Sequence, residues 1–228
     1  MAIICADTWQ DWRGAAVTGD DLTSAAAICA AVDRAVREAI HPFVPDPVTV
    51  TSHVMDAPPT PVLLLPLVPA RSVTAVYLRP GANGDPSLFT SDYLLTQFLD
   101  YFLPIDRPDL GYSRSGILRR RNAGSWGWEY RRPVNRLAPD IDPNRGAVCV
   151  SYLAGPASVP DDLFAAAATM VTKLMLSRKM GSQVASASLN GGSYSLPAGA
   201  LQGLLGDPLV QDVIANYRPP VRISVGGS

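Results

Sequence analysis

The sequence has few of the side chains that carry most enzyme chemistry. Its 228 residues include only two histidines, His41 and His53, and three cysteines. Cys5, Cys29 and Cys149 are odd in number and far apart, which excludes a paired disulfide framework and does not match the spacing of a zinc cluster. We therefore expect reduced thiols, and we interpret both histidines as structural residues, one at a helix end and one on a strand.

Long apolar runs and a strong net charge are also missing. The longest apolar stretch, VLLLPLV at 62–68, is broken by Pro66 and is far shorter than the roughly 20 residues of a membrane span. The first residues, MAIICADTWQDW, carry an acidic side chain where a signal peptide would carry positive charge. The formal net charge of −1 gives no overall field toward nucleic acid or anionic lipid. We expect a soluble intracellular protein without membrane contact.

Motifs for catalysis or cofactor binding are absent as well. The string nearest to a nucleophile elbow, GYSRS at 111–115, lacks the last glycine of Gly-x-Ser-x-Gly, and neither GxxxxGK[ST] nor GxGxxG occurs. Asp140 and Asp142 in PDIDP could share a hard cation, although their proline neighbours favour turns in which aspartate bonds its own backbone. We predict a protein that is not an enzyme, with no catalytic residue, no metal site and no cofactor.

Helical periodicity begins at residues 20–40, where apolar side chains recur at spacings of three and four. Asp20 or Thr18 can cap the start of this helix, and Pro42 lies just past its end. The spacing predicts one apolar face, made of six residues: Ala25, Ile28, Cys29, Val32, Val36 and Ile40.

Two further helices are predicted in the second half of the chain. The first spans 160–179, is rich in alanine, and has Ser158 as its cap and Pro160 in its first position. A shorter helix follows Asp207 as cap and Pro208 as first residue. Between them, residues 181–200 are small and polar, so we expect a flexible or extended segment.

Between residues 47 and 153 the apolar period changes from that of a helix to that of a strand. The predicted strands are 48–54, 62–68 as an edge or broken strand, 72–78, 91–96, 116–121 and 147–153. Two long irregular excursions, 97–115 and 122–145, separate some of them, and loops of this length in compact domains often serve an interface.

The order of elements predicts an α+β fold. We expect a small helical bundle, made of the N-terminal helix, the long alanine-rich helix and the short C-terminal helix, with an inserted antiparallel β region. Residues 1–180 would form one domain with its β-rich insertion at about 47–153. Residues 181–228 would add the flexible segment, the short helix and a C-terminal tail.

The densest group of arginine and aromatic residues marks a candidate interface. Such side chains stack on bases and grip phosphates, but they also make the strongest contacts of protein interfaces, and the near-zero net charge favours a protein partner. Trp9 and Trp12 raise the same choice, with a small satellite core as the alternative. The candidates, including three residues near the C-terminus, are Arg119, Arg120, Arg121, Trp126, Trp128, Tyr130, Arg131, Arg132, Tyr217, Val221 and Ile223.

The junction VCVSYLAGPASVPDDLFAAAATMV at 148–171 combines a strand, Tyr-x-Ala-Gly, a short loop, Val-Pro-x-Asp-Leu and an alanine-rich helix. Ahead of it, in order, stand the helix DDLTSAAAICAAVDRAVREAI, the strand PARSVTAVYL, DYLL and GILRR. In this order the segments resemble the head-to-tail connector, or adaptor, proteins of long-tailed bacteriophages, and the likeness spans roughly residues 20 to 180.

This resemblance implies a structural virion protein of the neck, made in the host cytoplasm. It would form a dodecameric ring beneath the portal protein and continue the DNA channel without sequence-specific binding. Its partners would be other copies of itself, the portal protein and a head-closure or tail-terminator protein. The segment at 181–200 would let the tail reach the portal. Another neck or tail-completion protein, and a non-viral binding module, remain the alternatives.

Overall fold

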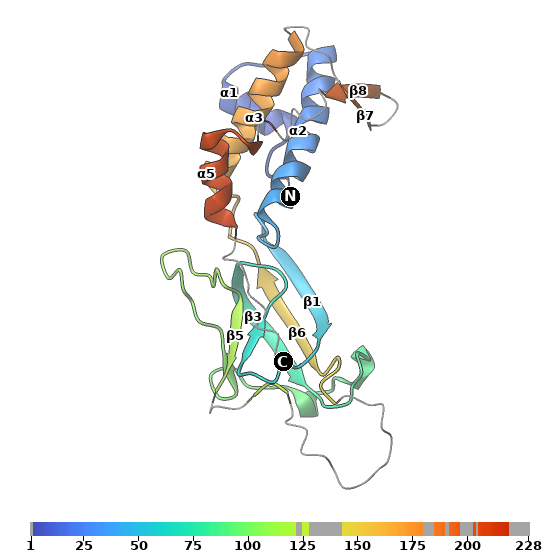
Figure 1. Ribbon diagram of the computed structural model, residues 1–228, viewed down its shortest axis with the longest axis vertical. Coiled ribbons are helices and arrows are strands. Elements are labelled where there is room, and N and C mark those ends of the chain that lie inside the picture. The colour runs from blue at the N-terminus through green and yellow to red at the C-terminus, as the bar shows by residue number, and fades with distance from the viewer. Residues whose placement is uncertain are drawn as a thin grey trace. The chain divides into compact units, whose positions relative to one another are not determined.

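The computed structural model describes residues 2–121, 125–127, 143–179, 185–189, 192–196, 203 and 205–218. The chain divides into two compact units (Figure 1). The helical unit combines Met1–Asp46 with Ala157–Ser228, and the β unit is Pro47–Pro156. Helices and antiparallel sheets are thus separated along the chain, which confirms the α+β class with a β region inserted between helices.

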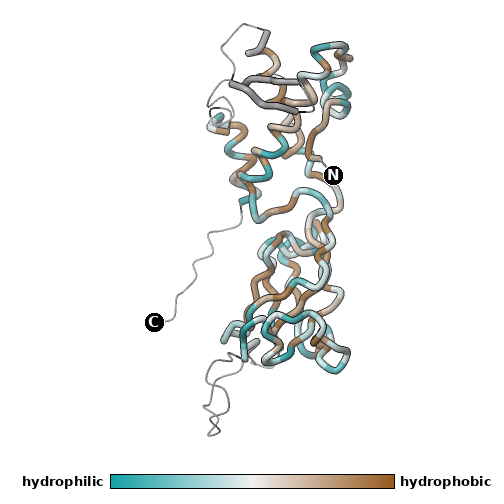
Figure 2. Tube along the Cα trace, turned by 90° about the vertical axis from the view of Figure 1, so that its right-hand side faces the viewer, coloured by the Kyte–Doolittle hydropathy of each residue, from teal (hydrophilic) through white to brown (hydrophobic). Residues whose placement is uncertain are grey.

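The helical unit packs α2 (Asp20–Ile40) against α3 (Asp161–Lys179). All six residues of the apolar face predicted for α2 are buried. The facing residues of α3 are buried too, and they include Leu163, Met170 and Val171. Hydrophobic and hydrophilic residues alternate along the helical coils (Figure 2), as expected when one face of a helix packs on another. The core of this unit therefore lies between α2 and α3.

The helix starts differ in part from the predicted ones. Gly19, with φ of +63°, stands ahead of α2 and no side chain caps that helix, so the prediction of Asp20 or Thr18 as the cap is wrong. The left-handed turn at Gly19 takes the place of a side-chain cap. The next helix, α3, begins one residue later than predicted, because the Pro160 carbonyl accepts the first helical bond from Phe164 N at 3.0 Å. Ser158 therefore precedes the cap position.

The C-terminal helix, α5 (Pro208–Tyr217), begins as predicted. The Asp207 carboxylate accepts from Leu209 N at 3.1 Å, and Pro208 follows it in the first turn. Val210 and Ile214 are the buried residues of this helix. The helix packs on both α2 and α3, so it belongs to the helical unit.

Two elements of the helical unit were not predicted. The first is α1 (Ala6–Arg13), in which Trp9 is 1% exposed and donates from Nε1 to Thr172 Oγ1 of α3 at 3.1 Å. Trp12 is 47% exposed, so only Trp9 belongs to the core. The second is a hairpin of β7 (Ala185–Leu189) and β8 (Gly192–Leu196), whose paired strands lie within the segment expected to be flexible or extended at 181–200.

The β unit contains two antiparallel sheets of three strands each. The first has the order β1-β6-β3, and the second has the order β2-β5-β4. The strands are β1 (Val48–Met55), β2 (Val62–Leu64), β3 (Ala70–Leu78), β4 (Tyr101–Phe102), β5 (Ile117–Arg120) and β6 (Val148–Ala154). As predicted, β2 is short and lies at a sheet edge.

Strand β6 is the centre of the first sheet. It pairs with β1 on one side and β3 on the other, and five of its seven residues are buried. Tyr152 in β6 is 1% exposed, and its hydroxyl accepts from Leu67 N at 3.0 Å. The backbone pairing of β6 thus holds the first sheet together, and its Tyr152 side chain holds the segment between β2 and β3.

The strand predicted at 91–96 is wrong. Ser91–Tyr93 form a short 3-10 helix, and beyond it only Leu94 makes an isolated bridge, to Tyr77 of β3. The guanidinium of Arg79 lies 4.8 Å from the ring centroid of Tyr93, and Leu95 N donates to Val76 O at 2.8 Å. These contacts hold the segment along the edge of β3 without a continuous ladder.

Among the described residues, no helix combines the length and apolar character needed to cross a bilayer.

The difference between Trp9 and Trp12 gives a matched test of the helical core. We expect Trp9→Phe to lower the free energy of unfolding by about 1–2 kcal/mol, because it loses the bond to Thr172 and part of a fully buried ring. Trp12→Phe, at an exposed position, should change it by less than about 0.5 kcal/mol. Urea unfolding followed by circular dichroism measures both, and equal losses would contradict the assignment.

Candidate interaction surfaces

The predicted arginine run lies on β5 and the residue after it, and its members have different surroundings. Arg119 is exposed, whereas the Arg120 guanidinium lies 5.7 Å from the ring centroid of Trp126. Arg121 N donates to Asp100 O at 2.8 Å, and the Arg121 guanidinium donates to Phe98 O. Arg120 and Arg121 therefore contact neighbouring parts of the β unit, whereas Arg119 and Arg121 are the two arginines of the run that are exposed.

Trp126 is enclosed within its own chain. Its side chain is 0% exposed, and its Nε1 donates to Pro61 O at 3.1 Å. Its backbone N donates to Thr60 O at 3.0 Å, so the segment lies along the chain just ahead of β2. A tryptophan beside arginines fits a core position as well as an interface. Trp128, Tyr130, Arg131, Arg132, Val221, Ile223, Asp140 and Asp142 lie outside the described residues.

Tyr217, the last residue of α5, joins three parts of the helical unit. Its ring centroid lies 4.9 Å from that of Phe43 in an edge-to-face arrangement, and its hydroxyl donates to Asp162 at the start of α3. Near it, Arg218 Nε donates to Ala39 O of α2 at 3.0 Å. Tyr217 is half-buried, so part of its surface serves the chain's own fold.

At the other end of α5 an ion pair joins the helix to α3. Lys173 Nζ donates to Asp207, and this bond holds the pKa of the Asp207 carboxyl below its usual range. Because the same carboxylate caps α5, one side chain both starts the helix and ties it to α3. The C-terminal helix is thus fixed at both ends by polar contacts.

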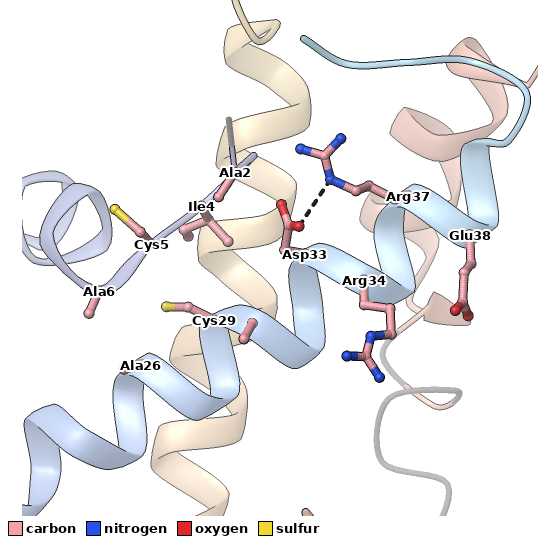
Figure 3. A pocket seen from close by; sticks show the side chains of 11 residues that line it. Ala2, Ile4, Cys5, Ala6, Ala26, Cys29, Asp33, Arg34, Arg37 and Glu38 are labelled. Atoms are coloured by element: carbon pink, nitrogen blue, oxygen red, sulfur yellow. Dashed lines mark hydrogen bonds and ion pairs between the residues drawn. The ribbon is translucent and has the colours of Figure 1, made fainter. Parts of the chain in front are cut away.

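A groove lies between the segment ahead of α1 and the exposed side of α2 (Figure 3). Much of its lining is small and apolar, with Ile4 and Cys29 buried in its floor. Burial raises the pKa of the Cys29 thiol to about 12, so this sulfur stays neutral at physiological pH. The lining consists of Ala2, Ile4, Cys5, Ala6, Ala26, Cys29, Ala30, Asp33, Arg34, Arg37 and Glu38. We call it the α1–α2 groove.

Charged side chains form one end of the α1–α2 groove. Asp33 accepts from Ile3 N at 2.6 Å and from Arg37 Nε at 3.0 Å, the contact drawn in Figure 3. Arg37 also donates from Nη1 to Asp46 at 2.7 Å. Burial by itself would raise the pKa of the Asp46 carboxyl, but the hydrogen bonds and positive charges beside it, those of Arg37 among them, outweigh burial and keep that pKa below its usual range. Arg37 thus joins α2 to the segment that follows it.

A second surface is the loop tip at Phe98 and Leu99, which we call the 98–99 tip. Their side chains are 64% and 66% exposed. Phe98 has φ of +66°, a conformation that costs a bulky residue about 1–3 kcal/mol and persists only where the surroundings impose it. The excursion at 97–115 was predicted to serve an interface without naming this pair. The sequence signal that could have identified this pair was the apolar dipeptide Phe98-Leu99 between the polar Gln97 and Asp100, in a segment rich in turn residues.

The comparisons with known proteins gave structural neighbours only. No family model matches the sequence, and no curated protein matches it. One similar structure is described as the neck of an empty GTA particle computed with C6 symmetry, with a TM-score of 0.48, 17% identity, and coverage of 99% of this chain and 93% of that one. The neck of a native GTA particle computed with C12 symmetry has a TM-score of 0.41 and 18% identity, covering 97% of this chain and 91% of that one. A third belongs to the virion of a native gene transfer agent (GTA) particle, with a TM-score of 0.43 and 17% identity.

The lowered pKa of Asp46 predicts a pH-dependent contribution to stability. Because the folded pKa lies below the unfolded value of about 3.9, the stabilisation is complete above that pH and is lost as pH falls through the folded pKa. Near pH 7 we expect Asp46→Asn to lower the free energy of unfolding by about 1–2 kcal/mol. Unfolding in urea between pH 7 and pH 2 should show the difference from the wild type shrinking in acid, whereas a constant difference would contradict the assignment.

Proposed function

We propose that this protein is a structural subunit of a phage-like neck. Copies of the chain form a ring between the portal protein and the next neck or tail protein, and the ring continues the DNA channel. The portal and a head-closure or tail-terminator protein are its proposed partners. DNA passes through without sequence-specific binding.

The order of elements along the chain carries this proposal. The segments that resemble phage connectors form α2, then β3, then β5, then β6 leading into α3. Each of these five elements occurs within a residue or two of its expected place, whereas the DYLL segment forms no strand. The β region interrupts a set of helices made from both ends of the chain. If the short motifs resembled those of phage connectors by chance, nothing would require these segments to form one helical unit with one inserted β region.

The predicted interface residues take different parts in this proposal. We propose that exposed Arg119 faces a neighbouring subunit, while Arg120 and the buried Trp126 support this surface from beneath and exposed Arg121 holds the neighbouring turn. Beyond α5, we propose that the tail containing Val221 and Ile223 docks on the portal. Because α5 is fixed to α2 and α3, the tail would start from a defined point of the helical unit.

Electron microscopy of the isolated protein, and of its mixture with the portal protein of the same particle, tests the proposed function. We expect rings with the symmetry of the portal, either free in solution or seated on the portal. Copies that stay monomeric alone but assemble on the portal also fit, because the portal then acts as the template. Monomers that never bind the portal would overturn the proposal.

Charge reversal at Arg119 tests its place in the ring. Arg119→Glu should reduce the fraction of assembled rings about tenfold or more while leaving thermal unfolding nearly unchanged, because the side chain is exposed in the single chain. Arg71→Glu, on β3 of the same unit, is the matched control and should assemble normally. Quantitative sedimentation with portal measures both, and equal effects of the two variants would remove Arg119 from the interface.

A further inference from the structure

The 98–99 tip is held in its conformation by a network of hydrogen bonds. Asp100 closes the turn, since its carboxylate accepts from Thr96 N at 2.7 Å and its backbone N donates to Thr96 O at 2.8 Å. Phe98 N donates to Tyr101 O at 2.7 Å, and the Arg121 guanidinium donates to Phe98 O. The surroundings therefore impose the positive φ of Phe98 and hold two large apolar side chains toward solvent.

Such an arrangement is costly unless the exposed side chains have a use. Backbone strain in folded proteins concentrates at sites of function, and a tip ordered before contact loses little conformational entropy when it binds. Phe98 and Leu99 are among the most exposed large hydrophobic residues of the described chain. The tip thus has the properties of a preformed contact that inserts into an apolar recess.

The α1–α2 groove has the complementary properties. Alanines line its walls and leave space for a large side chain, and Ile4 with the neutral thiol of Cys29 gives an apolar floor. Glu38 stands exposed at its charged end. A bulky apolar group would bury surface in this groove without desolvating an unpaired charge at its floor.

The segments that carry the two surfaces also differ in net charge. Residues 1–46, which form the groove, carry seven acidic and three basic side chains, although the groove lining itself has two of each. The β unit, which carries the tip, has nine acidic and eleven basic side chains. Next to the tip, β4 pairs with β5 through Phe102 and exposed Arg119. Opposite net charges of the two segments favour the approach of one copy to another.

We propose that the 98–99 tip of one copy inserts into the α1–α2 groove of a second copy. The contact joins two different surfaces, so it leaves a free tip and a free groove at the two ends of any pair and continues from copy to copy. It rests on the proposed function, because a contact of this kind closes into a ring when the rotation between neighbouring copies closes and otherwise continues as a filament. The occupant of the groove is the same protein.

Cys5 supplies a built-in reporter for this contact, because it is exposed and lines the groove. A Leu99→Cys variant would bring a second thiol beside Cys5 of the neighbouring copy. Oxidation by molecular oxygen with copper phenanthroline as catalyst removes two protons and two electrons and forms one intermolecular disulfide. We expect a ladder of cross-linked species on non-reducing gels, both for the isolated protein at high concentration and for the protein assembled on portal.

Two matched variants set the controls for the cross-link. Leu99→Cys combined with Cys5→Ser should lose the ladder, because the partner thiol is gone. Leu209→Cys, which places a thiol at a 74% exposed site on α5, should cross-link far less. A ladder that persists without Cys5, a ladder equally strong from Leu209→Cys, or no ladder at all would overturn the proposed contact.

Phe98→Asn separates the contact from the fold. Asparagine tolerates positive φ better than phenylalanine, so the variant should unfold at the same temperature or higher. It should nevertheless weaken self-association about tenfold or more in sedimentation, because the apolar side chain is gone. Loss of both folding and association, or unchanged association, would contradict the proposal.

The outcomes also separate this contact from the proposed function. Rings on the portal without a Cys5-dependent ladder would leave the neck function standing and overturn the contact. A Cys5-dependent ladder from copies that never bind the portal would support the contact and overturn the neck function.

Discussion

The pairing of β6 on both of its edges is the constraint on which the β unit depends. A strand flanked on both sides cannot shift its register without moving β1 and β3 together. The chain must leave this central position at Gly155, whose φ of +85° suits glycine and whose N donates to Pro69 O at 2.8 Å. The turn at Gly155 and the first helical bond to the Pro160 carbonyl therefore end one strand and start one helix within a few residues.

Elements with strong periodicity were predictable from the sequence, and their packing followed. In α2 all six predicted core residues are buried, with Ser24 as the one further buried residue, and α5 starts at the predicted Asp207 cap. Where two local signals competed, the prediction failed. Gly19 displaced the side-chain cap of α2, and residues 91–96 met the edge of β3 through single contacts instead of a ladder. In the hairpin, Asn190-Gly191 was an available turn signal that the small polar composition around it obscured.

The candidate surfaces were less predictable than the fold. In the sequence, Trp126 and Trp9 resemble aromatic residues of interfaces. In the structure each is buried and donates a hydrogen bond to a distant part of the chain, Trp126 to Pro61 and Trp9 to Thr172. The strain at Phe98 depends on Asp100, which belongs to the same turn, and on Arg121, which only the fold brings to it. Residue type therefore predicted an interface, while the tertiary contacts show which of the candidate side chains are held within the chain itself.

Strands β1 and β6 are the first and last strands of the β unit along the chain, and they are neighbours in the first sheet. Val48 at the start of β1 stands opposite Ala154 at the end of β6. The β unit is consequently entered and left at adjacent points of one ladder. An insertion built in this way can be exchanged as one unit, because its two covalent ends already lie side by side. Its loops can lengthen, shorten or change sequence without altering the path of the chain through the helical unit.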